Sequence, residues 1–529
     1  MASPALDSAR SIHAKPDKLP VTPLHGAQLR FAAIGLSLAT FMQVLDTTIA
    51  NVSVPTIAGG LGLSAGQGVW VITSFSAASA ISMPLTGRLA ERFGQLRVFM
   101  SATVLFVIAS FLCGISPSMQ ALVAARVLQG AVAGPLVPLS QALLLAVHPP
   151  QKRGQALSMW GAIVTVAPIL GPILGGYISD NASWPWIFFI NVPVGFIAVA
   201  FVWTTLHRVE TPRARPPLDI VGLLLLALWV GSLQIMLDKG QDEAWFESRL
   251  IVALAAISAI AFGYFLIWEL GDRHPIVHLA LFRNRNFLVG AGGAALLYGA
   301  FFGVTVLLPL VLQTQLGYTA TWAGLVLAPV GLLPVMASRI IGRNMYRLDP
   351  RVLVSSALLV VAAVMLMRSR FTSGVDFTTL VMPQFILGLG LLLMQTPLSA
   401  LTLSQLKPHE TAAALGLVTF LRYACGSFGA SLLTSLWQDR EALHHTRLVE
   451  ALASGRPATG QTLQMLTQHG FSFQQAYGVV EAALSQQSFI MAANDVFWVS
   501  AGFICMLVGI VWFAKPPFNY AAAPAAPAE

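Results

Sequence analysis

One carboxylate of this chain lies inside a long apolar run, where a side chain can bind and release a proton. Asp46 falls in the first such run, at about residues 31–54. An ionisable group at that depth in a bilayer costs at least about 2.5 kcal/mol, so it must face the protein interior or water. Proton carriage is one interpretation of Asp46. The other is a structural hydrogen bond to Thr47, Thr48 or Asn51 that holds a helix pair together.

Two arginines also lie within apolar runs. Arg126 is roughly 10 Å from the outer end of the fourth run, close to the depth expected for Asp46. A neighbouring cation favours the ionised acid and desolvation favours the neutral acid, so a small rearrangement would move a proton on or off Asp46. Alternatively, Arg126 ties helix ends together through backbone carbonyls. Arg422, in the thirteenth run, fits proton coupling and packing equally well.

The segment APILGPILGG at 167–176 carries small and helix-bending residues. Pro168, Gly171, Pro172 and Gly175 are spaced i, i+3, i+4 and i+7, which puts them on one face of a helix. Small residues there allow a second helix to come close, and two prolines bend the helix and free backbone carbonyls. Taken alone, this pattern predicts a packing face.

The elements that carry these residues are membrane helices. Of the 529 residues, 56% are hydrophobic and 10% are charged, whereas soluble domains are about a quarter charged. Each crossing takes about 20 residues, and backbone groups in lipid must pair within their own segment, so the apolar runs are helices. Fourteen runs are expected, at about 31–54, 69–87, 98–116, 119–146, 154–177, 187–206, 218–237, 250–270, 287–312, 321–341, 352–367, 378–403, 412–437 and 491–514.

The basic residues predict the orientation. Most of the 30 Lys and Arg residues fall on the side of the N-terminus, so both termini are expected in the cytoplasm. The +8 net charge is therefore a topology signal, and nucleic acid is not an expected partner. The first run is too long for a signal-peptide core, so it is kept as a spanning helix.

An internal repeat predicts two similar halves. LGLSA at 61–65 matches LGYTA at 316–320, and GRLAERFGQLRV at 87–98 matches GRNMYRLDPRV at 342–352 with the same offset. Each motif follows the equivalent helix of its half. The expected organisation is a cytoplasmic tail 1–30, a six-helix half 31–206, an inserted helix pair 218–270, a six-helix half 287–514 with a partly helical, soluble outer segment 439–490, and a tail 515–529.

The sequence lacks the residues that nucleotide-binding, disulfide and metal sites require. GK[ST] does not occur, so the chain has no phosphate-binding loop of its own. The three cysteines lie within apolar runs and support neither a disulfide framework nor a metal site. No metal, no cofactor and no enzymatic activity are expected; a transmembrane potential, worth about 2.3 kcal/mol per charge per 100 mV, is the expected energy source.

Four motifs together resemble the signatures of the major facilitator superfamily, in its fourteen-helix drug:proton antiporter branch. They are LDTTIANVSVP at 45–55, GRLAERFGQLRV at 87–98, LVAARVLQG at 122–130 and the GP-containing run at 162–176. WPWIFFINVP at 184–193, PIVHLALFRNRNF at 275–287 and the long segment before the last run are most similar to the EmrB-type multidrug pumps of Gram-negative inner membranes. The resemblance implies an all-α polytopic fold with 14 transmembrane helices in a 6 + 2 + 6 arrangement.

The resemblance also implies roles for particular residues. Asp46 and Arg126 would be the buried acid and base of proton coupling, with Arg422 a candidate third member, and Pro168, Gly171, Pro172 and Gly175 would be the antiporter motif. A cytoplasmic latch between the halves would consist of Gly87, Arg88, Glu91, Arg92, Gly94 and Arg97. Glu91 stands where an Asp is usual and Tyr346 where its counterpart would be in the second copy, so the latch charges are less regular here. His278 stands where an acid is common in relatives, which argues against a required charge there.

By analogy with the family, a cargo cavity would lie between the halves. Its candidate lining is apolar or aromatic with neutral polar groups: Gln43, Gln129, Tyr298, Phe301, Phe302, Gln313, Gln384, Met394 and Gln395. Met and aromatic faces at helical spacing are more often packing than ligand contacts. The absence of a second deep acid predicts cargo that is weakly acidic or neutral rather than cationic.

The expected function is proton-driven efflux of amphiphilic drugs across the inner membrane. The resemblance implies a periplasmic membrane-fusion adaptor (EmrA-like) and an outer-membrane channel (TolC-like) as partners, with segment 439–490 as the docking surface; Phe471, Phe473, Tyr477, Val480 and Leu484 would form its apolar stripe. The alternative for 439–490 is a tolerated insertion, because long surface loops cost little closure entropy. Two rival functions are a proton-coupled uptake permease and a channel or passive membrane protein.

Overall fold

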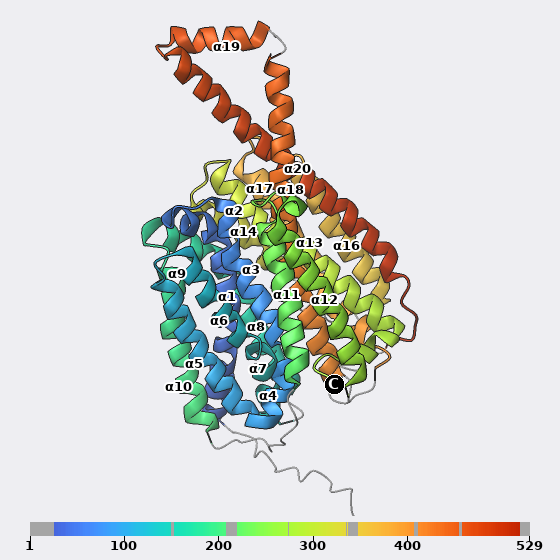
Figure 1. The fold of residues 1–529 in the computed structure, drawn as a ribbon. Coiled ribbons are helices and arrows are strands. Elements are labelled where there is room, and N and C mark those ends of the chain that lie inside the picture. The colour runs from blue at the N-terminus through green and yellow to red at the C-terminus, as the bar shows by residue number, and fades with distance from the viewer. Residues whose placement is uncertain are drawn as a thin grey trace, which may run out of the picture.

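The chain is represented by a computed structural model, which describes residues 26–149, 153–207, 219–272, 275–334, 336, 348–406, 411–453 and 457–518. Within these ranges the structure is helical and contains no β-strand. The helices form two bundles side by side with a helix pair between them, and a helical arm projects from one end (Figure 1). We call the end with the arm the arm end. The opposite end, where α1 begins and α20 finishes, is the terminal end.

The first bundle contains the helices α1 (Gly26–Gly60), α2 (Ala65–Gly68), α3 (Trp70–Ser82), α4 (Leu85–Phe93), α5 (Gln95–Gly114), α6 (Met119–Ala133), α7 (Leu136–Val147), α8 (Arg153–Asn181), α9 (Trp186–Phe189) and α10 (Asn191–Leu206). The pair between the bundles is α11 (Ile220–Lys239) and α12 (Arg249–Gly271), with a 3-10 turn η2 (Trp245–Glu247). The second bundle contains η3 (Leu279–Arg283), α13 (Arg285–Thr314), α14 (Ala320–Leu327), η4 (Ala328–Gly331), α16 (Pro350–Arg368), α17 (Phe377–Leu403), α18 (Thr411–Ala453), α19 (Pro457–Gln468) and α20 (Phe473–Val511).

Each expected apolar run coincides with a helix wherever the structure describes it. Eleven helices of the described residues are long and apolar enough to cross a membrane, or up to twelve when a bent pair counts as one span. The fifth and tenth expected runs fall on α8 and on α14 with η4. The protein is therefore a multi-pass, all-helical membrane protein, and the count of fourteen remains a prediction.

The second expected run is bent rather than straight. α3 and α4 meet at an angle of 57°, with Pro84 at the join. Proline lacks an N–H and cannot continue the hydrogen-bond ladder of the preceding turn, which explains the break. α4 ends at Phe93, and the following Gly94 has a φ of +92°, a conformation that favours glycine.

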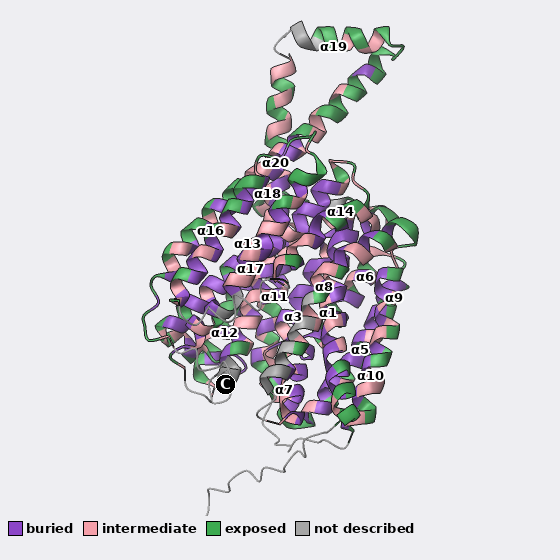
Figure 2. Cartoon of the chain, turned by 180° about the vertical axis from the view of Figure 1, so that it is seen from behind, coloured by how far each residue is buried: buried purple, intermediate pink, exposed green. Residues whose placement is uncertain are grey.

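Buried side chains run through both bundles, whereas the arm is mostly exposed or half-buried (Figure 2). One apolar cluster fills the second bundle, two fill the first, and a fourth joins α3, α11, α13 and α18. α12 lies at the edge and presents a row of exposed apolar side chains, among them Ile260, Tyr264 and Ile267. In a membrane protein such a face contacts lipid tails, so it needs no protein partner.

The two halves touch at the arm end. Gln313 Nε2 of α13 donates to Val52 O of α1 over 2.7 Å. The Asp180 carboxylate of α8 accepts from the backbone N of Ala320 and of Thr321 at 3.1 and 2.7 Å, at the start of α14. These contacts close the arm end of the interface between the halves.

The segment 439–490 is helical over most of its length. α18 continues past the bundle to Ala453, α20 begins at Phe473, and α19 connects them at the tip (Figure 1). At the base, Trp437 Nε1 donates to Phe489 O over 2.9 Å, and His444 Nε2 pairs with Asp495 Oδ2 at 2.9 Å. The expectation of a partly helical segment is thus met, and the two helices of the arm are direct extensions of spanning helices.

Candidate proton-coupling and cargo sites

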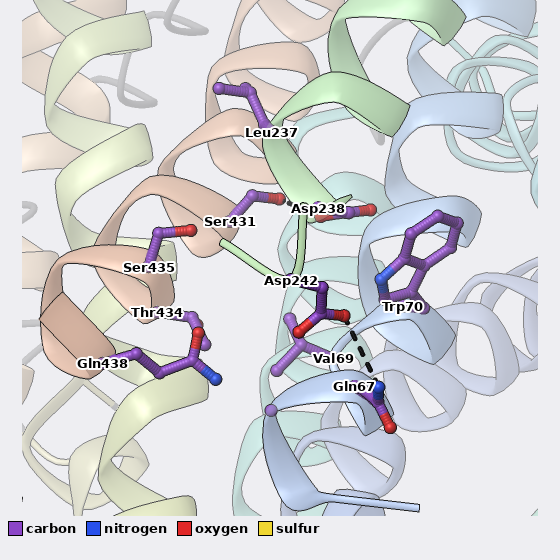
Figure 3. A pocket seen from close by; sticks show the side chains of 11 residues that line it. Gln67, Val69, Trp70, Leu237, Asp238, Asp242, Ser431, Thr434, Ser435 and Gln438 are labelled. Carbon is purple, nitrogen blue, oxygen red and sulfur yellow. Dashed lines mark hydrogen bonds between the residues drawn. The ribbon is translucent and has the colours of Figure 1, made fainter. Parts of the chain in front are cut away.

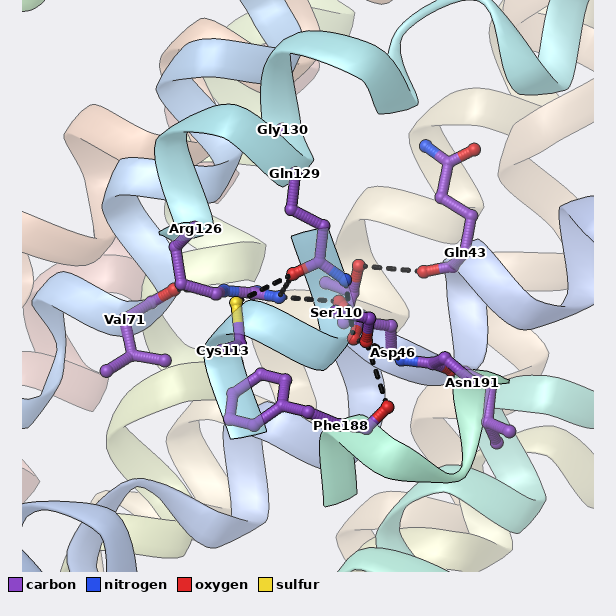
Figure 4. A network of polar contacts seen from close by, with 12 residues as sticks. Gln43, Asp46, Val71, Ser110, Cys113, Arg126, Gln129, Gly130, Phe188 and Asn191 are labelled. Carbon is purple, nitrogen blue, oxygen red and sulfur yellow. Dashed lines mark hydrogen bonds and ion pairs between the residues drawn. The ribbon is translucent and has the colours of Figure 1, made fainter. Parts of the chain in front are cut away.

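Asp46 and Arg126 form a buried ion pair in the first bundle (Figure 4). Arg126 Nη1 donates to Asp46 Oδ2 over 2.6 Å, and neither side chain is more than 1% exposed. The two residues are 80 positions apart in the sequence, and α1 and α6 bring them together. The pairing expected from their depths is present in the structure.

The Arg126 guanidinium is held from several sides. Its Nε donates to Val71 O over 2.8 Å, and Nη1 also donates to Gln129 Oε1 over 2.7 Å. The guanidinium carbon lies 4.3 Å from the centre of the Phe75 ring and 5.5 Å from that of Phe188. A planar cation over two aromatic rings keeps favourable contacts away from water, while its Nη2 has no hydrogen-bond partner among the described residues.

Two further side chains complete the site, and the sequence analysis did not single them out. Asn191 Nδ2, at the start of α10, donates to Asp46 Oδ1 over 2.7 Å and contacts Ser110 Oγ of α5 at 2.9 Å. Both residues are fully buried. The sequence offers one signal for Asn191: it is a polar residue near the start of an apolar run, in WPWIFFINVP.

Gln129 belongs to this site, although we expected it in the cargo cavity. Its Nε2 donates to Asp46 Oδ1 over 3.1 Å, and its Oε1 accepts from Arg126 and, at 3.5 Å, from Cys113 Sγ. One helical turn separates Gln129 from Arg126 on α6, so both reach the same carboxylate. That shared face explains the misplacement.

The small residues of α8 pack directly on α1. A methyl group on Gly171 would overlap Thr48 Oγ1, and one on Gly175 would lie 2.9 Å from Ile49 O. Thr48 is two residues from Asp46, so α8 lies directly behind the ion pair. Thr48 Oγ1 is within 3.4 Å of Ala167 O, and Ser53 Oγ donates to Gly175 O over 3.4 Å. Pro168, by contrast, faces the cavity described next.

A cavity of about 510 Å³ lies between the halves, toward the terminal end. α1 and α8 line it from the first bundle, and α13, η4, α17 and α18 from the second. Of the described residues that line it, Arg422 is the one charged side chain; its guanidinium carbon lies 4.7 Å from the Tyr298 ring centre. A volume of this order fits a drug-sized molecule.

The expected cavity residues divide into two groups. Tyr298, Phe301 and Met394 line the cavity, together with Arg422. The others do not: Phe302 stacks on Tyr298 at 5.8 Å, Gln313 bonds α1 at the arm end, and Gln43 and Gln384 are buried outside the cavity lining. The side chain of Gln395 lies outside the described residues.

The latch residues lie around the turn between α4 and α5. Gly87, Glu91, Arg92 and Arg97 are exposed, Arg88 is half-buried and Gly94 is buried. Burial lowers the pKa of His278, between α12 and α13, and the Arg88 guanidinium acts in the same direction, so this turn lies near the second half. The second copy, with Gly342, Arg343, Tyr346 and Arg347, lies outside the described residues.

Two acids that the sequence analysis did not single out are buried or half-buried at the ends of α11 and α12. α11 extends to Lys239, so Asp238 lies within its last turn and is half-buried. Glu269 of α12 is 3% exposed and accepts from Val277 N over 3.1 Å. Asp46 is therefore not the one acid that makes protein contacts within the described helices.

Fold and site together define a polytopic transporter: two helical bundles around a central cavity, with a buried ion pair beside it. The sequence profile of the Major Facilitator Superfamily matches residues 36–430, and the chain belongs to this family. Among similar proteins, the multidrug export protein EmrB of Escherichia coli (strain K12) is 50% identical over 498 residues, covering 94% of this chain and 97% of that protein. The fatty acid resistance protein FarB of Neisseria gonorrhoeae is 48% identical over 497 residues, covering 94% and 98%.

Solved structures share the fold at low sequence identity. A peptide transporter POT in complex with sulfate has a TM-score of 0.63 at 15% identity, covering 94% of this chain and 98% of that one. A bacterial homologue of the human lysosomal transporter Spinster, inward-facing and occupied, has a TM-score of 0.62 at 15% identity, covering 93% and 100%. These likenesses bear on the fold alone.

Proposed function

We propose that this protein exports amphiphilic drugs or toxic compounds across the bacterial inner membrane in exchange for protons. The observation that carries the proposal is the buried Asp46–Arg126 ion pair, together with a central cavity between the two bundles. Relatives at about half identity over nearly the whole chain are named as multidrug export proteins, which supports export as the direction. Both termini are expected in the cytoplasm, with the arm in the periplasm.

Proton exchange at Asp46 would change the contacts among three helices. The ionised carboxylate accepts from Arg126, Gln129 and Asn191, which belong to α6 and α10. Charge-assisted bonds are roughly twice as strong as neutral ones, so protonation weakens the link from α1 to both helices. Arg126 keeps Val71 O and Gln129 Oε1 as acceptors in either state. The site can therefore hold or release a proton without leaving the guanidinium unbonded.

The transport path would alternate between the two ends of the bundle interface. The halves are in contact at the arm end, through Gln313 and Asp180, while the cavity lies toward the terminal end. Cargo would enter the cavity from the cytoplasm or the inner leaflet and leave after the halves rock about α1 and α8. The close α1–α8 contact at Gly171 gives that motion a rigid surface.

The cavity favours weakly acidic or neutral amphiphiles. Its walls are mostly apolar, and Arg422 supplies the positive charge beside Tyr298. A guanidinium binds a carboxylate through two parallel hydrogen bonds, and the apolar walls accept the hydrocarbon part. One relative is named for fatty acid resistance, which agrees with such cargo.

The arm would dock a periplasmic adaptor that continues the path to an outer-membrane channel. Phe471, Phe473 and Tyr477 are 43%, 65% and 51% exposed near the start of α20. Two aromatic rings, of Phe473 and Tyr477, pack edge to face at 4.8 Å. Exposed aromatic pairs of this kind are typical of protein interfaces.

The test is proton release from purified protein in proteoliposomes across a panel of acidic, neutral and cationic amphiphiles. We expect release with acidic and neutral compounds. Arg422→Gln should weaken binding of the acidic compounds by about tenfold or more, as expected for the loss of a charge-assisted pair of about 1.5–3 kcal/mol, and should spare neutral ones. Cargo-independent conductance would favour a channel, and accumulation of cargo by intact cells would favour the uptake permease.

A further inference from the structure

A carboxylate outside the Asp46 site connects both halves with the inserted pair. Asp238 lies near the arm-side end of α11, between α3 of the first half and α18 of the second (Figure 3). Its Oδ2 accepts from Thr73 Oγ1 over 2.9 Å, and its Oδ1 accepts from Gln234 Nε2 over 2.9 Å and from Ser431 Oγ. One carboxylate therefore holds α3 and α18 against α11.

The surrounding bonds extend this junction. Gln234 Nε2 also donates to Ser431 Oγ over 2.7 Å, and Gln234 Oε1 accepts from Ser427 Oγ over 2.7 Å. Ser427 is also 2.9 Å from Thr73 O. Asp238 is the charged member of a junction whose other members are neutral.

No described cation forms an ion pair with Asp238. α3 contains no charged residue between Trp70 and Ser82. α18 faces the carboxylate with hydroxyl and amide groups of Ser431, Thr434, Ser435 and Gln438, and the other charged groups nearby are Lys239 on the same helix and Asp242 in the following turn. This environment differs from that of Asp46, whose charge is balanced by Arg126.

The junction accommodates either protonation state. When Asp238 is ionised, Thr73 and Ser431 both donate to it. When it is protonated, one hydroxyl must accept instead, and each has a second acceptor in its own helix: Val69 O is 3.3 Å from Thr73 Oγ1, and Ser427 O is 3.3 Å from Ser431 Oγ. A hydroxyl rotation is enough to satisfy the proton. The bonds between helices then lose their charge assistance, which weakens them by roughly half.

A small pocket reaches the carboxylate from the arm end. Its volume is about 20 Å³, room for about one water molecule, and Gln67, Asp242 and Gln438 line it beside Asp238. Thr434, 6% exposed, lines the same pocket, and its Oγ1 has no hydrogen-bond partner among the described residues. A buried hydroxyl without a protein partner is a place for an ordered water, and a water here would connect the carboxylate to the pocket entrance.

We propose that Asp238 is a second proton-binding site, reached from the periplasm through this pocket, and that its protonation loosens the α3–α11–α18 junction at the arm end. The inference rests on the proposed antiport, to which it adds a proton-controlled outer junction. A proton taken from the periplasm would weaken the closure of the arm end when cargo must leave. Protonation of Asp46 then changes the contacts within the first bundle, and protonation of Asp238 changes the contact between the halves.

The test follows labelling of a cysteine in the pocket by a membrane-impermeant maleimide from the arm side. Gln438→Cys is introduced with Asp238 retained, and in combination with Asp238→Asn, Asp238→Glu and Asp242→Asn. A neighbouring carboxylate raises the pKa of the introduced cysteine thiol. Asp242→Asn removes one such charge from the pocket, so it measures how far this effect alone changes the labelling, and the remaining difference between backgrounds reports the junction. The amide of Asp238→Asn can accept from Gln234 and Ser431 and donate to Thr73, so it matches the protonated state in shape.

With Asp238 retained, we expect labelling relative to the Asp238→Asn background to change between about pH 8 and pH 6, by at most about tenfold per pH unit, the limit for one linked proton. Asp238→Glu should keep this dependence, and Asp242→Asn, which removes the neighbouring carboxylate, should also keep it. Equal pH profiles with Asp238 and with Asp238→Asn would overturn the proposal, as would loss of the dependence in Asp242→Asn alone.

Labelling needs neither cargo nor a gradient. Absence of cargo-driven proton movement in proteoliposomes would therefore contradict the antiport itself, whereas coupled transport with pH-independent labelling contradicts only the role of Asp238.

Discussion

At the scale of single residues, three buried polar side chains decide what the first bundle can do. Asp46, Arg126 and Asn191 come from α1, α6 and α10 and meet within hydrogen-bond distance. Removing one partner of a buried ion pair leaves an uncompensated charge, which costs about 3–5 kcal/mol. A neutral isostere of Asp46 keeps the shape and part of the hydrogen bonding but leaves the Arg126 charge without its counter-ion, so folding and insertion of such a variant are measured alongside its transport.

Asp46→Asn should abolish proton-driven export while the protein remains folded and inserted. The amide keeps the shape and can still accept one bond, but it cannot exchange a proton. Cargo-driven proton release in proteoliposomes should fall to the level of empty vesicles. Retained coupled transport in Asp46→Asn would remove this carboxylate from the mechanism.

Arg126→Lys, which keeps the charge, should lose most activity because one ammonium cannot reach Val71 O, Asp46 and Gln129 in the geometry of the guanidinium fork.

At the scale of elements, α1 and α8 behave as one packed unit. Gly171 and Gly175 bring the backbone of α8 against Thr48 and Ile49, and hydroxyls of α1 reach carbonyls of α8. The prolines of α8 remove two N–H donors from its own ladder. We therefore expect the proposed antiporter motif to act through close packing rather than through a reactive group.

Gly171→Ala should reduce export because its added methyl overlaps Thr48 Oγ1. Overpacking of this kind costs about 1–3 kcal/mol, and the strain falls on the helix that carries Asp46. Turnover and thermal stability of the purified variant are the measurements. Gly263→Ala, on α12, is the matched control, since a methyl there also meets no atom within 4 Å, and it should keep the wild-type stability. Normal turnover and stability of Gly171→Ala would show that α1 and α8 can separate at no cost.

At the scale of the whole molecule, the arm is a part of the chain that the two bundles do not need in order to enclose the cavity. α18 and α20 extend beyond the bundle and are joined at their base by His444–Asp495 and by Ser488 Oγ, which is 2.9 Å from Glu441 Oε1. Most described side chains near the tip are exposed. Such a projection fits a docking element that is separate from the transport path.

Deletion of residues 450–485 should spare proton-coupled transport in proteoliposomes and abolish both drug resistance in cells and co-purification with the adaptor. Phe473→Ser with Tyr477→Ser is a milder version, because both rings are exposed and their loss leaves no cavity. Gln474→Ser, on an exposed neighbour, is the control and should keep resistance. If the truncated protein still protects cells and still binds the adaptor, the arm is a tolerated insertion.

The sequence by itself determined the membrane helices, the buried acid and base, and the packing motif. This is possible because backbone groups in lipid must bond within their own segment, so hydropathy alone predicts helices, and because Asp46 and Arg126 stand out in apolar runs. The sequence did not separate Gln129, which holds Asp46, from Tyr298, which lines the cavity: both are polar residues of inner helix faces. Nor did it predict Asn191 at the ion pair or Asp238 at the junction with Thr73 and Ser431. These contacts join positions 145 to 193 residues apart, and only the packing angles and relative rotation of the helices decide which faces meet.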